Sequence, residues 1–460
     1  MSFFKSLVAA VALLGTAQAA GVTGTPVGFA SGTTGGGNAA AAAPSDITEL
    51  TKWLGDSTPR TILIDKEFNY LSSQGKCTDC KCCVPDSNTC GSAGQNAIDN
   101  SDWCGSYPTT ACTYDKAGLE GITVASNKSI VGVGSEGVIR GKGLLMKNGV
   151  SNVIIQNIHI TELNPQFIWG GDAITLDGTD KIWIDHVKVS LVGRQMFVSG
   201  YESAGKVTIS NSEFDGRTSW SSSCDGHHYW TVLGYGKGDH VTFTGNYIHH
   251  TSGRSPKLEF ANYWHAYNNY WFNNTGHAFD VGENVNAFIE GNVFHQVDTP
   301  MLTDSKPGAT FAVTTSTQST CKSAIGRTCA ANTLVQSGKL SGSDESVLKN
   351  WPSGETGVNV VDATRVRSSV LSNAGVGKLS SSSKRRREFP FAPSLPILSS
   401  AGPGASAVGP RPTWGWKTVG AQSSATPSAT PEPVQSPGFG HGHRHGHGHG
   451  NGGFGGFGWF

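Results

Sequence analysis

The sequence predicts an all-β protein with the architecture of a parallel β-solenoid, and three observations carry this prediction. The 460-residue chain contains 61 glycines, which favours many turns between short strands over long helices. Its central part repeats a pattern in which a polar residue follows an apolar pair. The repeat unit has the length of one solenoid coil, and such a coil buries its apolar face only by stacking on the next one.

Six segments share this repeat: SNVIIQNIHI, KIWIDHVKVS, KVTISNSEFD, HVTFTGNYIHH, HAYNNYWFNN and AFIEGNVFHQ. The polar residue of the repeat is, in chain order, Asn157, Asp185, Asn211, Asn246, Asn269 and Asn292. The last three are evenly spaced, whereas the earlier turns are longer. We align all six at one bend and expect the asparagines to form a ladder of stacked amides with a structural role.

The solenoid domain is expected to span residues 20–377 and to begin with one short helix in the segment SDITELTKWLGD. Asp46 is the expected N-cap of this helix, with a glutamate three residues later. Ile47, Leu50 and Leu54 have helical spacing and share one face. This pattern predicts a helix that covers an end of the core.

Both ends of the chain differ from the repeats. Residues 1–19 combine Lys5, an apolar stretch and the cleavage pattern Ala17–Ala19, and so predict a secretory signal peptide. Residues 378–460 are rich in Ser, Pro, Gly and His and are predicted to be a disordered tail because they cannot form a packed core. Within the tail, Lys384–Arg387 is interpreted as a solvated basic run rather than a processing site, and the alternating His–Gly run as a spacer or a weak binder of divalent metal ions.

The composition excludes several classes of partner. The 34 basic and 34 acidic side chains balance, so the chain has no overall electrostatic attraction to nucleic acid or to anionic membranes. After the signal peptide, no stretch approaches the length of apolar sequence that a membrane span needs. We therefore expect a secreted, extracellular protein that is a monomer and has no nucleic-acid or membrane partner.

Ten cysteines in a secreted chain predict disulfide bonds. Four of them cluster in the stretch CTDCKCC, which resembles a zinc site, but no distal Cys/His pair matches it and we favour oxidation. Asn127 and Asn273 begin tripeptides that fit the glycosylation pattern. These features agree with the predicted passage through the secretory pathway.

A set of short motifs occurs in order between Gly21 and Asn373: WGGDAITLD, WIDHV, GRQ, DGHHYW, SGRSPK and GHAFDVGENVNAFIEGNVF. Together these motifs resemble the fungal pectin lyases of the pectate lyase superfamily, polysaccharide lyase family 1. The resemblance implies a single right-handed parallel β-helix that cleaves methyl-esterified polygalacturonan, or pectin, by β-elimination. Such cleavage leaves a 4,5-unsaturated sugar at the new chain end.

Removal of the C5 proton of a uronate creates negative charge at the adjacent carboxyl group, so the site must supply cations there. Pectate lyases use calcium held by acidic side chains, but the corresponding stretch VSLVGRQMFV contains no acid. By the resemblance, Arg194 is a built-in cation in place of calcium, and we expect no cofactor and no metal. Asp172, about one coil earlier in the sequence, is its expected salt partner.

The resemblance places Arg254, in TSGRSPKLEF, at the reacting carbon as the base, with Lys257 three residues later. A guanidinium has a pKa above about 12 and is normally charged in proteins. Nearby positive charge from Arg194 and Lys257 is expected to disfavour the charged form through like-charge repulsion. An alternative is that Arg254 stabilises the enolate while hydroxide takes the proton.

Aromatic side chains are expected to line the substrate groove, because sugar faces stack on them and an esterified polymer offers little charge. The candidates are Trp103, Trp169, Tyr229 and Trp230. His227 and His228 adjoin these aromatics and are minor candidates. Asp185 and His186 resemble a catalytic dyad, but their place in the repeat favours an internal hydrogen-bonded pair.

By resemblance, Cys90 pairs with Cys224, Cys321 pairs with Cys329, and Cys104 pairs with one of the cysteines from Cys77 to Cys83. The cysteine-rich insertion departs from the family pattern, and Cys112 closes an extra bridge in one interpretation. A calcium-dependent pectate lyase and a noncatalytic polysaccharide-binding solenoid are the alternatives to a pectin lyase. A polygalacturonase-like hydrolase is disfavoured because it needs clustered aspartates, and the chain has no Asp-Asp pair.

Overall fold

The computed structural model of the protein describes residues 21–303 and 307–379. The predicted signal peptide, the run Lys384–Arg387 and the His–Gly run lie outside the described residues. The predicted boundary between the domain and the tail stays a prediction. Among the residues that the structure covers, no helix is long and apolar enough to cross a membrane.

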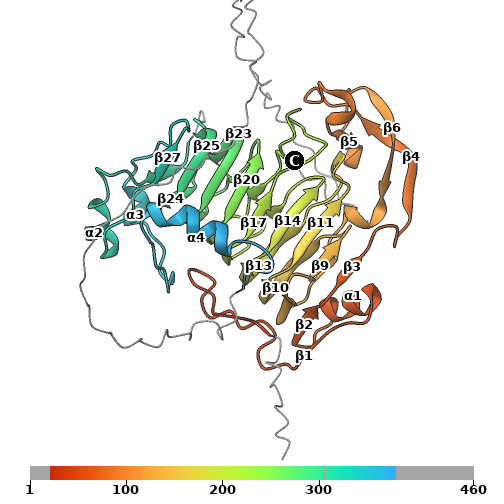
Figure 1. Ribbon diagram of the computed structural model, residues 1–460, viewed down its shortest axis with the longest axis horizontal. Helices are drawn as coiled ribbons and strands as arrows, with labels where there is room; N and C mark the ends of the chain where they lie inside the picture. The colour runs from red at the N-terminus through yellow and green to blue at the C-terminus, as the bar shows by residue number, and fades with distance from the viewer. Residues whose placement is uncertain (1–20, 304–306, 380–460) are drawn as a thin grey trace, which may run out of the picture. The chain divides into compact units, whose positions relative to one another are not determined.

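The described chain winds into coils with three faces, and strands of successive coils pair in parallel on each face (Figure 1). Face 1 consists of β7 (Ile122–Thr123), β15 (Phe197–Ser199), β18 (Val232–Gly234), β21 (Lys257–Leu258) and parts of β10 (Leu144–Gln156), β13 (Ile174–Asp185) and β23 (Tyr270–Val281). Face 2 consists of β1 (Ala41–Ala42), β2 (Arg60–Ile64), β8 (Lys128–Gly132), β16 (Lys206–Ser210), β19 (His240–Thr244), β22 (Tyr263–Tyr267), β24 (Asn286–Glu290), β26 (Ala309–Ala312) and the second halves of β10 and β13. Face 3 consists of β3 (Glu67–Asn69), β9 (Val138–Arg140), β11 (His159–Leu163), β14 (Lys188–Val192), β17 (Glu213–Asp215), β20 (Tyr247–Thr251), β25 (Val293–Met301), β27 (Thr333–Val335) and the first half of β23.

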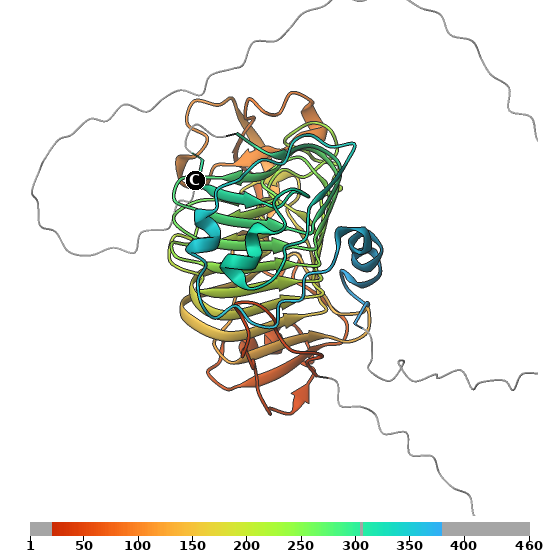
Figure 2. The same ribbon diagram turned by 90° about the vertical axis from the view of Figure 1, so that its left-hand side faces the viewer.

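In-register pairing fills the interior with stacked apolar rows. On face 2, one row runs through six coils: Val153, Ile182, Val207, Val241, Trp264 and Ala287. All six side chains are fully buried in one continuous core. Figure 2 shows the strands as successive layers from the N-terminal coils to the C-terminal coils. The predicted β-solenoid is confirmed, because each coil covers the apolar edge of its neighbour.

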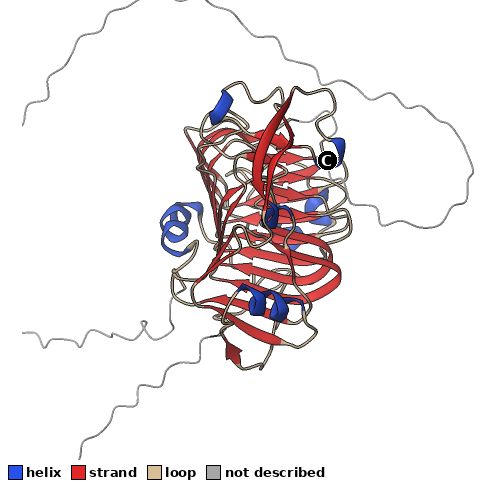
Figure 3. Cartoon of the chain, turned by 90° about the vertical axis from the view of Figure 1, so that its right-hand side faces the viewer, coloured by secondary structure: helices blue, strands red, loops and turns tan. Residues whose placement is uncertain are grey.

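The helices lie outside the stacked strands (Figure 3). They are α1 (Ile47–Gly55), α2 (Thr320–Ile325), α3 (Ser346–Lys349), α4 (Val366–Asn373) and the 3-10 turns η1 (Gly91–Ala93), η2 (Asn100–Asp102), η3 (Lys116–Leu119) and η4 (Ala363–Arg365). Helix α1 begins as predicted, since the Asp46 carboxylate accepts hydrogen bonds from the N–H groups of Thr48 and Glu49. Leu50 and Leu54 are buried in the core, so the predicted covering helix is confirmed.

A small second sheet lies beside the coils and comprises β4 (Lys76–Cys83), β5 (Asn96–Ile98), β6 (Thr109–Asp115) and β12 (Phe167–Ile168). Its β4 and β6 pair antiparallel, in contrast to the coil strands. Strand β12 pairs in parallel with β5 and belongs to the turn between β11 and β13. The cysteine-rich insertion is therefore attached to the side of the solenoid through that turn (Figure 1).

The asparagine ladder is present at the bend between face 2 and face 3. Asn246 Nδ2 donates to Asn269 Oδ1 at 3.0 Å, and Asn269 Nδ2 donates to Asn292 Oδ1 at 3.0 Å. The ladder continues to Asn332, whose Oδ1 accepts from Asn292 Nδ2 at 3.0 Å. At its other end, Asn246 Oδ1 accepts from the backbone N–H of Ser212. A structural role for these three repeat positions is confirmed.

The alignment of the earlier turns with this ladder is wrong. Strand register aligns Asp185 with Ser210 and then with Thr244, Tyr267 and Glu290 in the following coils. The ladder residues Asn246, Asn269 and Asn292 each come two positions after the last three of these aligned residues. Asp185 therefore lies two positions before the ladder. One position before the ladder, each of the six coils has a residue with φ between 46° and 68°, and these residues are Asn157, His186, Asn211, Gly245, Asn268 and Gly291. Asparagine and glycine tolerate this left-handed bend, so Asn recurs at two adjacent positions for two different reasons.

We predict that Asn269→Ala lowers the free energy of unfolding by at least about 3 kcal/mol, because each buried polar group left without a partner costs about 1–3 kcal/mol. The fully buried Asn269 side chain bonds the backbone N–H of Asn246, the carbonyl of Phe243 and the amide of Asn292. Chemical denaturation measures this loss. Asn373→Ala, at an exposed helix end, is the matched control and should change stability by less than about 0.5 kcal/mol; equal effects of the two substitutions would contradict the ladder's role.

Candidate active site

The predicted catalytic residues lie together in the turn that joins face 3 to face 1. Arg194 lies between β14 and β15, Arg254 between β20 and β21, and Asp172 just before β13. Tyr229 and Trp230 precede β18 in the corresponding turn after β17. Since the coils stack, residues one coil apart in the sequence become neighbours along this edge.

Arg254 is held by its backbone and leaves part of its guanidinium unpaired. Its φ of 45° is left-handed, its N–H donates to His277 Nε2 at 3.1 Å, and its carbonyl accepts from the N–H of Val232 at 2.6 Å. The guanidinium carbon lies 4.6 Å from the ring centroid of Trp230 and 5.8 Å from that of Tyr229. Nε and Nη1 are buried and have no hydrogen-bond partner in the described part of the chain. Such orphan donors are costly unless a ligand satisfies them, which marks Arg254 as a binding group.

Arg194 lies two coils before Arg254, in the same column of turns, and within range of its charge. Its guanidinium carbon is 3.8 Å from the ring centroid of Trp169, and its Nη1 is 4.0 Å from Asp172 Oδ2. Burial lowers the pKa of Arg194, and the charge of Arg254 acts in the same direction, while Asp172 opposes both. Burial raises the pKa of Asp172, while Arg194 lowers it. The expected pair of Arg194 and Asp172 therefore exists, at the long distance of 4.0 Å.

Lys257 is more strongly paired than the sequence suggested. Its Nζ lies 3.0 Å from Asp280 Oδ2 and 3.1 Å from Glu259 Oε1. Burial lowers the pKa of Lys257, but these two carboxylates more than offset it and the pKa is raised. Lys257 is therefore a charged side chain whose field at Arg254 is reduced by its own partners.

Sequence reasoning missed His277 and Asp280, although a signal was present. His277 follows Arg254, and Asp280 follows Lys257, at the same spacing that separates the asparagines of the ladder. The imidazole of His277 contacts the ring of Tyr229 edge-on, with centroids 5.9 Å apart. Burial lowers the pKa of His277, which keeps Nε2 available as the acceptor for Arg254.

The four predicted groove aromatics are all partly exposed. Trp169 contacts Arg194, Tyr229 and Trp230 contact Arg254, and Trp103 contacts Trp169. Trp103 and Trp169 lie 6.4 Å apart in an edge-on contact, and Tyr229 and Trp230 lie 5.0 Å apart in another. The indole N–H of Trp230 donates to Gln95 Oε1 at 3.1 Å, which fixes the ring. Trp103 belongs to the cysteine-rich insertion, so this insertion contributes one wall of the site.

His228 positions the site and does not face it. It is buried, and its Nε2 donates to the carbonyls of Arg194 at 2.8 Å and Trp230 at 3.1 Å. Burial lowers the pKa of His228 to about 4, so the ring is neutral above that pH. His227 instead donates from Nδ1 to the Asp225 carbonyl and stacks on the ring of His250. Neither geometry is that of a catalytic base at Arg254.

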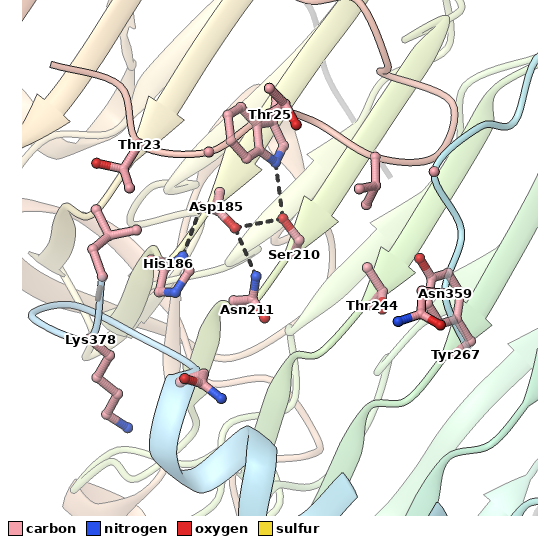
Figure 4. A pocket seen from close by; sticks show the side chains of 16 residues that line it. Thr23, Thr25, Asp185, His186, Ser210, Asn211, Thr244, Tyr267, Asn359 and Lys378 are labelled. Atoms are coloured by element: carbon pink, nitrogen blue, oxygen red, sulfur yellow. Dashed lines mark hydrogen bonds and ion pairs between the residues drawn. The ribbon is translucent and has the colours of Figure 1, made fainter. Parts of the chain in front are cut away.

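Asp185 and His186 form the internal pair that the repeat suggested, at the bend between face 2 and face 3 (Figure 4). His186 Nδ1 lies 2.7 Å from Asp185 Oδ2, and Asp185 Oδ1 accepts from Ser210 at 2.7 Å and Asn211 at 3.0 Å. The pair lines a surface pocket together with Trp183 and other residues. A whole face 3 strand separates this bend from the turn that carries Arg194, so the pair is not part of the arginine site.

All ten cysteines are paired: Cys77 with Cys80, Cys82 with Cys112, Cys83 with Cys104, Cys90 with Cys224, and Cys321 with Cys329. The three expected pairings are confirmed, and the extra bridge of Cys112 closes to Cys82. The zinc interpretation is wrong, because the four clustered thiols are consumed as disulfides.

Among the described residues, one group of three side chains has the geometry of metal ligands: Glu213, Asp215 and His249. Lys188 Nζ already lies 3.0 Å from Glu213 and 3.1 Å from Asp215. An ammonium group therefore neutralises these carboxylates, and the group lies on the outside of face 3 rather than in the arginine turn.

We predict that the Cys90–Cys224 bond stabilises the fold more than the Cys321–Cys329 bond, because it closes a loop of 134 residues instead of 8. The chain-entropy model gives about 4–5 kcal/mol for the long loop and about 2–3 kcal/mol for the short one. Thermal unfolding of C90A/C224A and C321A/C329A measures the difference. A larger loss for the short loop would contradict the prediction.

Comparison with known proteins identifies the family. The family model described as pectate lyase matches residues 2–379. A probable pectin lyase F from Aspergillus niger is 65% identical over 458 residues, which cover 95% of this chain and 96% of the relative. A probable pectin lyase F from Aspergillus flavus is 68% identical over 384 residues, which cover 83% of this chain and 90% of the relative. A solved pectate lyase from Xanthomonas campestris has a TM-score of 0.50 at 19% identity, covering 77% of this chain and 98% of that chain, and shares the right-handed parallel β-helix. The chain belongs to the pectate lyase family.

Proposed function

We propose that this protein is a secreted pectin lyase that cleaves methyl-esterified (1→4)-α-D-galacturonan by β-elimination. The relatives that match most of its length are named pectin lyases. One observation carries the proposal: Arg254, whose buried Nε and Nη1 have no partner among the described residues, lies in the same column of turns as Arg194 and within range of its charge. Two fixed cations along one edge of the coils suit a reaction that develops negative charge there.

In the proposed reaction, the C5 proton leaves and its electron pair forms the C4–C5 double bond. The C4–O4 bond breaks, and the departing oxygen takes a proton from solvent. Charge that accumulates on the ester carbonyl during this step is stabilised by the fixed guanidinium of Arg194. Arg254 lies at the reacting carbon, where it takes the proton or donates to the enolate while hydroxide takes the proton.

The surrounding residues orient the sugar chain and the arginines. The partly exposed rings of Trp169, Tyr229 and Trp230 provide faces on which pyranose rings stack. His277 and the carbonyl contact to Val232 fix the backbone of Arg254. Since no described acidic side chain pairs with Nε or Nη1 of Arg254, these donors remain available to the substrate.

Secretion and glycosylation also belong to the proposal. The signal-peptide pattern of residues 1–19 supports secretion. Asn127 and Asn273 are both partly exposed, which glycosylation requires. The monomeric state also stays a prediction.

We predict that Arg254→Ala lowers kcat on highly esterified pectin by about 10³-fold or more, since it removes the donors at the reacting carbon. The measurement is the ultraviolet absorbance of the unsaturated product. Circular dichroism should show an unchanged fold, because the hydrogen bonds to His277 and Val232 are made by the Arg254 backbone. Retained turnover in a folded variant would remove Arg254 from catalysis. A residual rate that rises tenfold per pH unit would assign proton removal to hydroxide.

We also predict that EDTA leaves the activity on esterified pectin unchanged, because fixed guanidinium groups supply the positive charge. The assay compares esterified pectin with de-esterified polymer, each with and without chelator. Loss of activity with EDTA and a preference for the bare polymer would instead identify a calcium-dependent pectate lyase. Absence of unsaturated product from every substrate would favour a noncatalytic polysaccharide-binding solenoid.

A further inference from the structure

The outside of face 1, next to Arg194, carries an apolar patch. Strand register places Thr175, Val198, Leu233 and Lys257 side by side in successive coils. Their neighbours Ile174, Phe197 and Val232 belong to the interior core, whereas Val198 and Leu233 do not. Because side chains alternate along a strand, Val198 and Leu233 point outward. Two aliphatic side chains therefore lie between the arginine turn and a charged lysine.

These two side chains form the floor of a small, largely enclosed pocket. Asp172 and Arg194 line one end, and Tyr201 and Tyr235 line the other. The two tyrosine rings contact each other edge-on at 5.7 Å, and Tyr235 contacts Phe260 edge-on at 4.8 Å. Each of these rings follows a face 1 strand, in three successive coils. The pocket thus has an arginine–carboxylate pair at one end and is apolar along its floor, with aromatic rings at the far wall.

The Tyr201 ring at this wall and the Phe260 ring beside it have exposed fractions that are high for large apolar side chains. Tyr201 is 41% exposed and Phe260 is 46% exposed, although both lie in a cluster of rings. Exposed aromatic clusters next to a polar site mark surfaces that bind a ligand. Burial raises the pKa of Tyr235, which keeps its phenol neutral and the wall free of negative charge.

We propose that this pocket receives the alkyl group of the uronate ester whose carbonyl meets Arg194, and that it selects esterified over free uronates. An ester presents a carbonyl oxygen, which matches the guanidinium, and an alkyl group, which matches Val198 and Leu233. A free carboxylate would place a charged oxygen against these aliphatic side chains without a partner, which is unfavourable. The inference rests on the proposed function, since it names the part of the site that reads the ester.

The size of the pocket gives a test with the unmodified enzyme. A methyl group fits a small enclosed space and a longer alkyl group does not, and one methylene in such a pocket is worth about 10–200-fold in kcat/KM. We expect kcat/KM to fall by at least about tenfold from methyl-esterified to ethyl-esterified galacturonan. Equal values for the two esters would overturn the proposal.

Substitution of Val198, in the floor of the pocket, should change the kinetics on the two esters according to the size of the new side chain. Val198→Ala enlarges the pocket, so the ethyl-to-methyl ratio of kcat/KM should rise by about tenfold. Val198→Ile shrinks the pocket, so kcat/KM on the methyl ester should fall by about tenfold. Val335→Ala and Val335→Ile are matched controls on an exposed strand position of face 3, and they should leave both values unchanged.

The outcomes separate this inference from the proposed function. If the unmodified enzyme makes no unsaturated product from any galacturonan, the proposed function fails. If it is active and the folded Val198 variants keep the same ester ratio, only the pocket assignment fails. Thermal unfolding of each variant establishes that it is folded, and the ester series with the unmodified enzyme decides the question if a variant does not fold.

Discussion

In-register stacking of the coils is the constraint on which every other feature depends. It brings residues one coil apart in the sequence into contact, as in the pairs Arg194 with Asp172 and Arg254 with His277. The same register builds the buried rows of face 2 and the asparagine ladder. A shift of one residue would exchange interior and exterior side chains along a strand, so the core fixes the register and the register fixes the site.

The arginine turn keeps buried hydrogen-bond donors without a partner among the described residues. Lys257 is neutralised by Asp280 and Glu259, and Arg194 has Asp172 at 4.0 Å. Arg254 rests against aromatic rings, and its buried Nε and Nη1 have no partner in the described part of the chain. A folded protein tolerates such unsatisfied donors where stability elsewhere offsets them, and the continuous core of the coils provides that stability.

The three kinds of turn between the faces have different roles. The bend from face 2 to face 3 is short, and its Asn, Gly and His residues adopt a left-handed conformation. The turn from face 3 to face 1 is long, carries the arginines, and is braced by the cysteine-rich insertion through Cys90–Cys224 and Gln95. The turn from face 1 to face 2 contributes Tyr201 and Tyr235 to the opposite side of the groove. Regular strands thereby hold irregular loops at fixed separation.

The sequence by itself determined the solenoid, the capped helix at Asp46, the disulfide chemistry and the candidates Arg194 and Arg254, because periodicity, capping and residue type are local properties. Only the tertiary structure decided which residue of each repeat is the bend, since Asn157 and Asn246 follow similar apolar pairs but lie one position apart in register. It also decided that Lys257 is neutralised by acids, that Arg254 keeps free donors, and that Val198 and Leu233 face outward. These facts depend on which coils are neighbours and how far apart their atoms lie, and a one-dimensional pattern contains no such distances.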